Sequence, residues 1–301
     1  MNVFVKGRKI IVYNKIFRIV INRINQSISR KNIKTNPQLV IFSFDHIGLS
    51  LNIEGRYENS ALYLVEDFIN QKLPAAKDSA VLDIGANIGN HTVFFSKMFQ
   101  KVYAFEPNPV TYEVLQINSN FVSEAKNIQT FNFGLSDVDG SLPFLINRSN
   151  IGGSAITECD DTSENIINVI VKKLDDLTTV NEAKIALIKI DVEGHELQVL
   201  KGAKNTLAEH MPAILFEQEA SQIVAGSSEV VKFLEELGYG FFTIKKNFYF
   251  GEGVFSKVVG LALRTLLGEQ LDFIEVNEFE RKFYNMLLAV PKTQLYDGLM
   301  S

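Results

Sequence analysis

The sequence has few residues that form covalent or metal cross-links, with 1 cysteine and 4 histidines among 301 residues. Cys159 has no partner for an internal disulfide, and no cysteine and histidine cluster has metal-site spacing. This composition favours a reducing, cytoplasmic compartment. No apolar run reaches the roughly 18 residues of a membrane-spanning helix. Charges interrupt any signal-peptide core, so secretion is not expected.

Acidic residues are absent from positions 1–44, which carry nine basic side chains, whereas the remainder has 21 basic and 35 acidic residues. Apolar residues recur every three or four positions, which predicts a basic amphipathic helix over about residues 13–30. They are Phe17, Val20, Ile21, Ile24 and Ile28. Two interpretations stay open. Residues 1–34 could contact an anionic membrane peripherally, or the helix could pack its apolar side on an acidic catalytic domain.

The rest of the chain is apolar enough for a full core, with 46% hydrophobic residues overall. We divide the whole chain into a basic segment (1–36), a lead-in (37–79) and a main domain (80–301). Residues 39–44 are expected to form a strand and residues 60–71 a helix. From residue 80, short apolar runs alternate with helical patterns, which predicts an α/β fold with a mostly parallel sheet.

The expected strands of that sheet are residues 81–84, 101–105, 128–133, 185–190, 213–216, 239–244 and 286–290. Helices are expected near residues 92–99, 111–120, 196–207, 228–237 and 254–267. Residues 141–171 interrupt the alternation with polar and glycine clusters between two β-prone runs. We interpret this segment as an inserted hairpin, with its tip at residues 151–154.

A glycine loop follows the strand at residues 81–84 and opens a helix. Its spacing, from Gly85 to Gly89, is G-x-x-x-G, and the dinucleotide fingerprint G-x-G-x-x-G is absent. Asp83 would repel a pyrophosphate but would suit an ammonium or a sulfonium, as in S-adenosylmethionine. Glu106 ends the next strand, where doubly wound folds place a ribose-hydroxyl acceptor. These features predict a nucleoside-bearing cofactor; the alternative is an ordinary strand-turn-helix capped by an asparagine.

A second cluster, Asp191, Glu193, His195 and Glu196, follows the strand at residues 185–190. Ligands bind at the carboxyl ends of parallel strands, so Asp191 should lie near Asp83 and Glu106. The cluster could recognise an ammonium, act as a general base or hold Mg²⁺. Alternatively, Asp191 caps a helix and Glu196 interacts with its dipole. One acidic loop does not define a metal site, so we predict no metal.

In order along the chain, these motifs resemble the FkbM family of S-adenosylmethionine-dependent methyltransferases over about residues 55–291. The resemblance rests on residues 55–58, 83–89, 105–107, 134–137, 174–177, 189–194, 201–203 and 288–291. It implies a class I methyltransferase fold, with a Rossmann-like sheet of seven strands whose last strand is antiparallel. It also implies transfer of a methyl group to a hydroxyl oxygen, often on a sugar or a natural product.

The resemblance, together with the loop positions, gives the expected site. The expected cofactor-binding residues are Asp83, Gly85, Asn87, Gly89, Glu106, Leu135, Ser136, Asp137 and Asp191. The expected catalytic residues are Asp191, Glu193 and His195. His195 is chosen for its location alone. Glu193 and His195 are candidates for the base that removes the hydroxyl proton, with Glu217 ranked third. Tyr57, Glu58 and Glu217 are expected to bind the acceptor.

The leading hypothesis is an O-methyltransferase acting on a carbohydrate, a glycolipid or a related metabolite. Two alternatives stay open: a nucleotide-dependent oxidoreductase, and a non-catalytic membrane-associated binding protein with a vestigial cofactor pocket. Nucleic acid is not an expected partner, because the main domain is acidic and lacks an aromatic and basic strand pattern.

Overall fold

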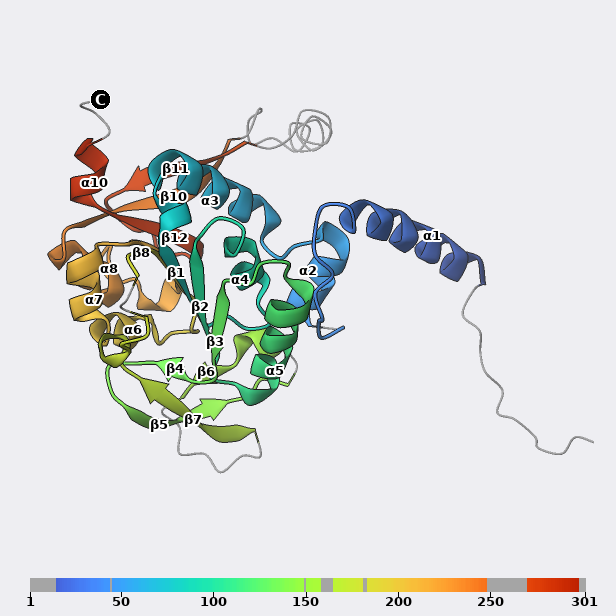
Figure 1. Cartoon of the computed structure of the whole chain (residues 1–301). Coiled ribbons are helices and arrows are strands. Elements are labelled where there is room, and N and C mark those ends of the chain that lie inside the picture. The colour runs from blue at the N-terminus through green and yellow to red at the C-terminus, as the bar shows by residue number, and fades with distance from the viewer. Residues whose placement is uncertain are drawn as a thin grey trace, which may run out of the picture.

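The computed structural model describes residues 15–43, 45–148, 150–157, 165–180, 183–247 and 270–297. In this part of the chain, an eight-stranded sheet has the order β11-β10-β12-β9-β8-β1-β2-β3 (Figure 1). Five neighbouring strands run parallel. They are β3 (Ile128–Phe131), β2 (Lys101–Phe105), β1 (Ala80–Ile84), β8 (Ile185–Ile190) and β9 (Ala213–Gln218). The expected α/β fold is therefore confirmed.

The other end of the sheet contains the antiparallel strands. The last strand, β12 (Tyr284–Pro291), pairs antiparallel with β9 and with β10 (Tyr239–Asn247), as predicted. β11 (Gln270–Val276) adds an eighth strand beside β10, so the expected count of seven is too low for the described sheet. An edge strand pairs on one side only and needs no continuous apolar run, which is why the pattern did not reveal it. The helix expected over residues 254–267 lies outside the described residues.

Helices cover both faces of the sheet. On one face, α3 (Asn59–Lys72) and α4 (Asn90–Phe95) share a core with β1 and β9 that includes Leu62, Phe95 and Leu215. On the other face lie α6 (Glu196–Lys201), α7 (Lys204–His210) and α8 (Glu229–Glu236). α5 (Pro109–Ile117) packs Leu115 against Ala86 and Ala104. The strands are thus buried on both sides, as their continuous apolar runs predict.

The single helix expected over residues 196–207 is two helices, α6 and α7, which separate at Gly202. A Cβ atom at Gly202 would collide with the backbone carbonyl of Ser136. Glycine thus lets this corner touch the strand end that begins the inserted segment. Periodicity alone does not reveal such a contact.

The inserted segment forms a hairpin, as predicted, in which β5 (Gly140–Leu145) pairs antiparallel with β7 (Ile166–Lys172). The hairpin belongs to a second sheet in the order β4-β7-β5-β6, with β4 at Gly134–Leu135 and β6 at Ala155–Ile156. Phe144, Val169 and Val171 form a small core of its own. This sheet lies at the bottom of Figure 1, beside the carboxyl ends of the parallel strands. Cys159 is outside the described residues.

The N-terminal part differs in two ways from expectation. The basic helix is present as α1 (Lys15–Asn32), followed by α2 (His46–Glu54), but residues 39–43 form no strand. Instead the side chain of Asn118 accepts a hydrogen bond from Val40 N at 2.8 Å and donates one to Val40 O at 3.0 Å. The prediction of a strand over residues 39–44 is therefore wrong for the described positions.

α1 extends away from the sheet and its helices in Figure 1, so its predicted apolar side is not packed on the main domain. Phe17 is 64% exposed and Ile24 is 53% exposed. Of the described helices, none combines the length and the apolarity needed to cross a bilayer.

Candidate active site

The loop after β1 is shaped by left-handed backbone conformations. Gly85 has a φ of 75°, and a Cβ atom there would collide with the backbone carbonyl of Asp191. Gly89 has a φ of 91° and precedes α4. Asn87, between them, has a φ of 50°, a conformation that asparagine tolerates better than most residues. The two glycines therefore let the loop turn closely against the end of β8.

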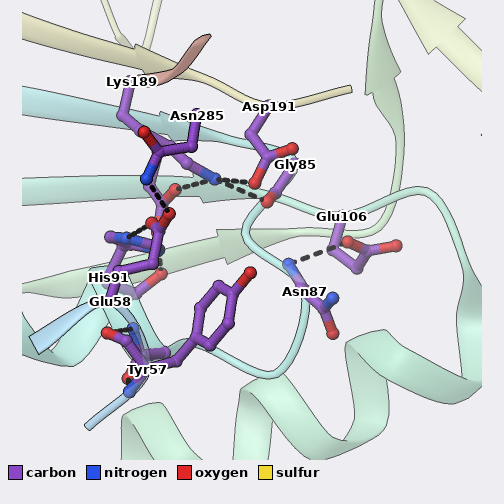
Figure 2. Close-up of polar contacts among 12 residues, drawn as sticks. Tyr57, Glu58, Gly85, Asn87, His91, Glu106, Lys189, Asp191 and Asn285 are labelled. Atoms are coloured by element: carbon purple, nitrogen blue, oxygen red, sulfur yellow. Dashed lines mark hydrogen bonds and ion pairs between the residues drawn. The ribbon is translucent and has the colours of Figure 1, made fainter. Parts of the chain in front are cut away.

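A buried lysine joins this loop to the two strands beneath it. Lys189 pairs with Asp83 in the register of β8 and β1. Its Nζ donates to Gly85 O at 3.0 Å and lies 3.1 Å from Asp191 Oδ2 and 3.5 Å from Asp83 Oδ1 (Figure 2). Burial works to lower the pKa of Lys189, but Asp191 and Asp83 outweigh it, so the pKa is raised. Lys189 is therefore a fixed cation at the centre of the site.

Glu106 is held by backbone donors on both oxygens. Its Oε2 accepts from Asn87 N at 2.9 Å, and its Oε1 accepts from Asn108 N at 2.8 Å. Burial raises its pKa to about 7, although these two hydrogen bonds lower it. Each oxygen keeps a free lone pair, so the carboxylate can accept two further hydrogen bonds from a ligand.

The start of α4 holds a turn that lies far from it in sequence. Asn90 exchanges two hydrogen bonds with the backbone of Tyr57, one at 3.1 Å and one at 3.2 Å. The neighbouring His91 Nε2 lies 3.2 Å from Glu58 Oε2, and Asn285 Nδ2 lies 3.4 Å from Glu58 Oε1. Figure 2 shows the Tyr57 ring between Glu58 and Asn87. α4 thus fixes a tyrosine and a glutamate over the loop.

Two cavities open at this place. The narrower one, which we call the cofactor cleft, is bounded by the ends of β1, β2 and β4 and by the inserted sheet. Its outer wall includes Phe144 and Ile156 of that sheet, and Gly152 from the turn between β5 and β6. Ten of its other residues are Gly85, Asn87, Glu106, Asn108, Thr111, Leu135, Asp191, Val192, Glu193 and His195.

The second cavity, which we call the acceptor cavity, has a volume of about 400 Å³ and lies beside α2. Its walls combine segments from residue 46 to residue 285. The carboxylates that line it are Glu54, Glu58, Asp191, Glu193, Glu217 and Glu219. Four residues, Asn87, Gly152, Asp191 and Glu193, line both cavities, so a ligand in one would meet a ligand in the other there.

Backbone strain is concentrated at the acceptor cavity. Among the described residues, five non-glycine positions have positive φ, and three of them, Glu58, Asn87 and Glu193, line this cavity. Such conformations cost of order 1 kcal/mol or more and persist where the surrounding structure enforces them. Their clustering supports a functional role for this surface.

Carboxylates in the acceptor cavity lack enough positive partners. Burial raises the pKa of Glu193 to about 7, and the charges of Asp191 and Glu196 add to the effect. Burial raises the pKa of Glu217 to about 9, together with repulsion from Asp191 and Glu58. At neutral pH, Glu193 is therefore near its titration midpoint and Glu217 is protonated.

The predicted acceptor-binding residues Tyr57, Glu58 and Glu217 come together in the acceptor cavity. Leu135 and His195 line the cofactor cleft, as do Gly85 and Glu106. His195 Nε2 lies 2.9 Å from Ser136 Oγ, beside Asp137, and burial lowers the pKa of His195.

Asp83 lies deeper than expected, because it is fully buried and accepts a hydrogen bond from Thr92 at 2.5 Å. The structure therefore places it behind the loop, where it neutralises Lys189, and not on the wall of the cleft. Gly89 also shapes the loop from behind, since Leu115 packs against it.

Several residues of the site were not predicted as such. They are His46, Glu54, His91, Thr111, Lys189 and Asn285. Lys189 had a readable signal, because it is the one charge in an otherwise apolar strand that should pair with the strand of Asp83. Within the described residues, no three side chains of His, Cys, Asp or Glu form a group suited to a metal ion.

Comparison with known families agrees with this geometry. The family model of the methyltransferase FkbM domain matches residues 83–241, which is more than half of the chain. The chain belongs to the FkbM methyltransferase family. The match includes the loop after β1, Glu106, the inserted sheet and the Asp191 cluster.

Two curated relatives show how far the similarity extends. Hexuronic acid methyltransferase AglP of Haloferax volcanii is 35% identical over 144 residues, covering 47% of this chain and 57% of that protein. Methyltransferase 1 of Beauveria bassiana is 28% identical over 176 residues, covering 48% and 70%. The chain thus spans little more than half of AglP. A solved FkbM methyltransferase from Methylobacillus flagellatus has 18% identity and a TM-score of 0.34, covering 67% of this chain and 49% of that one.

Proposed function

We propose that this protein is an S-adenosylmethionine-dependent O-methyltransferase that methylates a hydroxyl group of a carbohydrate or a glycolipid. The observation that carries the proposal is the meeting of the cofactor cleft and the acceptor cavity at Asp191 and Glu193. A methyl donor in the cleft and an acceptor in the cavity would face each other at these carboxylates. Membership of the FkbM family supports methyl transfer as the reaction.

The residues of the cleft fit the methyl donor. Glu106 offers a free lone pair on each oxygen, which suits the two hydroxyls of a ribose. Thr111 Oγ1 is buried in the wall and has no hydrogen-bond partner, so a polar ligand atom would satisfy it. Asp191, at the junction, suits a ligand ammonium. Leu135, Ser136, Asp137 and His195 are assigned to the adenine side.

The protein has two tasks in this reaction, because the sulfonium of the bound donor already activates the methyl carbon. One task is to align the acceptor hydroxyl, and the other is to accept its proton as the new carbon–oxygen bond forms. Glu193 suits the second task, since its pKa of about 7 leaves it substantially ionised at neutral pH and it faces both cavities. Glu217, protonated with a pKa of about 9, would donate a hydrogen bond to the acceptor.

His195 receives a different role from the one its position in the sequence indicated. It lines the cofactor cleft beside Ser136, and it is not among the residues that line the acceptor cavity. We therefore assign it to the donor and leave Glu193 as the base. His195 then positions the adenine side through Ser136.

The charge of the acceptor cavity favours a neutral or an amine-bearing acceptor. Of the described residues that line it, six are carboxylates and His46 is the one basic side chain. A hexuronic acid, the substrate named for AglP, would bring another carboxylate into a cavity whose own carboxylates already repel one another. We therefore propose a hydroxyl-rich acceptor without a carboxylate for this protein.

Calorimetry with S-adenosylhomocysteine tests the donor site. We expect micromolar binding, weakened about 100-fold in Glu106→Ala, because two ribose contacts and two backbone partners are lost. Glu113→Ala, which changes an exposed glutamate of α5, is the matched control and should bind normally. Absence of binding by the folded wild-type protein would overturn the proposal.

The acceptor class is tested with labelled S-adenosylmethionine and three alkyl glycosides that differ in one group: glucoside, glucosaminide and glucuronide. We expect methyl transfer to either of the first two and none to the glucuronide. Preference for the glucuronide would contradict the charge argument. Cell-surface glycans compared by mass spectrometry with and without the gene would then identify the natural acceptor through a lost methyl group.

A further inference from the structure

α1 presents an apolar face that no other described part of the chain covers. This apolar face of α1 consists of Phe17, Val20, Ile21 and Ile24, which are between 38% and 64% exposed. At 100° per residue these four positions fall within one third of the helix circumference. Two apolar residues of the neighbouring α2, Leu49 and Ile53, are also exposed. An uncovered helix face of this kind marks an interaction surface.

The rest of the circumference of α1 carries arginines together with one exposed isoleucine, Ile19. Arg18, Arg23 and Arg30 are exposed, lie away from the apolar face, and have no acidic residue within the helix to pair with. Residues 1–44 as a whole carry nine basic side chains and no acidic one. Such a helix lies in the interface of a membrane, with apolar side chains among the lipid chains and arginines at the headgroups. We propose that α1 docks this protein on an anionic lipid surface.

Charge complementarity favours lipid over a second copy of the chain. Two α1 helices packed through their apolar faces would bring two sets of basic residues together, which is unfavourable. A lipid surface offers both an apolar layer and negative headgroups, which attract the basic residues of α1.

The position of α2 connects this surface to the acceptor cavity. Asn32, the last residue of α1, donates from Nδ2 to Ile53 O of α2 at 3.2 Å. Other residues of α2, His46, Ile47, Ser50 and Glu54, line the acceptor cavity. A protein docked through α1 thus has its acceptor cavity one helix away from the lipid. This arrangement suits a lipid-linked acceptor, but the docking itself does not depend on the proposed methyl transfer.

Vesicle sedimentation of the full chain tests the proposal. Anionic vesicles of phosphatidylcholine with roughly 30% phosphatidylglycerol are compared with vesicles of phosphatidylcholine alone. We expect binding to the anionic vesicles that falls with added salt. The double variant Val20→Gln/Ile24→Gln should bind the anionic vesicles at least roughly tenfold more weakly than the wild type. At low salt, Arg18→Gln/Arg23→Gln should show a similar loss of affinity.

The matched control is Ile170→Gln/Val224→Gln, which changes two exposed apolar residues elsewhere, 52% and 71% exposed. It should sediment like the wild type. Failure of the wild type to bind, or equal binding by the apolar-face variant, would overturn the proposal. Self-association in the absence of lipid that the same variant abolishes would assign the face to a second copy and would also overturn it. Binding of S-adenosylhomocysteine by each variant reports on the donor site separately.

Discussion

The cofactor cleft and the acceptor cavity share a wall but are built differently. In the cleft, Glu106 is fixed by two backbone N–H groups and the loop is fixed by Lys189. In the acceptor cavity, the walls come from α2, the turn at Tyr57, the end of β9 and the start of β12. Burial, together with repulsion among its carboxylates, raises the pKa of both Glu193 and Glu217.

This difference suits a cofactor cleft that keeps one ligand and an acceptor cavity whose ligand can vary. Backbone hydrogen bonds do not depend on side-chain identity, so the cleft can keep one ligand while sequences around it change. The acceptor cavity depends on side chains from distant segments, and each can change independently of the others. Its unbalanced charge costs stability in the free protein, and such cost is typical of functional surfaces.

The largest effect is expected from removing the charge of Lys189 beneath the wall that the two cavities share. Lys189→Met leaves the buried Asp83 and the neighbouring Asp191 without their positive partner. We expect a loss of about 3–5 kcal/mol in the free energy of unfolding, measured by urea denaturation. Lys232→Met, which breaks the exposed pair with Glu229, should cost less than about 1 kcal/mol. Similar losses in the two variants would contradict the central role of Lys189.

The close turn of the loop should be the next most sensitive feature. Gly85→Ala adds a Cβ atom that collides with Asp191 O, at a φ of 75° that alanine disfavours. We expect about 2–4 kcal/mol of destabilisation and loss of S-adenosylhomocysteine binding. Gly140→Ala is the control, because nothing lies within 4 Å of a Cβ atom there. If calorimetry finds unchanged affinity in Gly85→Ala, the loop does not line the donor.

Donor affinity should depend on pH through Glu106. Its pKa of about 7 in the free protein means that the carboxylate is mostly protonated at pH 6 and mostly ionised at pH 8. An ionised carboxylate accepts hydrogen bonds from ribose more strongly, so affinity should rise up to about tenfold across this range. Glu106→Gln should abolish the rise, whereas Glu193→Gln should keep it. A rise that survives in Glu106→Gln would assign it to another group.

The smallest effect is expected at Glu217, on the acceptor side. Its pKa of about 9 in the folded protein exceeds the ordinary value of 4.5, so the folded state binds more protons between these values. Stability should therefore fall as pH rises from 4.5 to 9. Glu217→Gln should flatten this slope and raise Tm at pH 5.5, where about one pH unit of it has accumulated, by roughly 3 °C in scanning calorimetry. The exposed control Glu235→Gln should leave both unchanged; a lower Tm for Glu217→Gln would refute the assigned strain.

Much of the fold was predictable because its strands are buried on both faces. Continuous apolar runs such as β1 and β8 identify themselves, and the alternation with helices fixes the parallel arrangement. The edge strand β11 and the absent strand near Val40 were not predictable. β11 pairs with a neighbouring strand on one side only. The backbone of Val40 is hydrogen-bonded to the side chain of Asn118 and not to a strand. Both outcomes depend on tertiary contacts that sequence spacing does not encode.

The donor side of the site was also more accessible to prediction than the acceptor side. Gly85 and Glu106 follow successive strands, so topology alone brings them together. His46 and Asn285 line the acceptor cavity from separate elements, and His91 supports Glu58 from α4. None of the three carries a local motif. Asp83 was predicted at the right place in the chain but at the wrong depth, because the sequence does not show that Lys189 and Thr92 occupy its carboxylate.

Asn118 has one further consequence. Its Nδ2 donates both to Ile88 O, in the loop after β1, at 2.7 Å and to Val40 O, in the chain leading from α1, at 3.0 Å. The loop after β1 and the N-terminal segment are therefore hydrogen-bonded to the same side-chain amide, so a shift of either one acts on the other. If anchoring of the N-terminal segment changes the affinity of the loop for a ligand by some factor, that ligand must change the affinity of the segment for its anchor by the same factor.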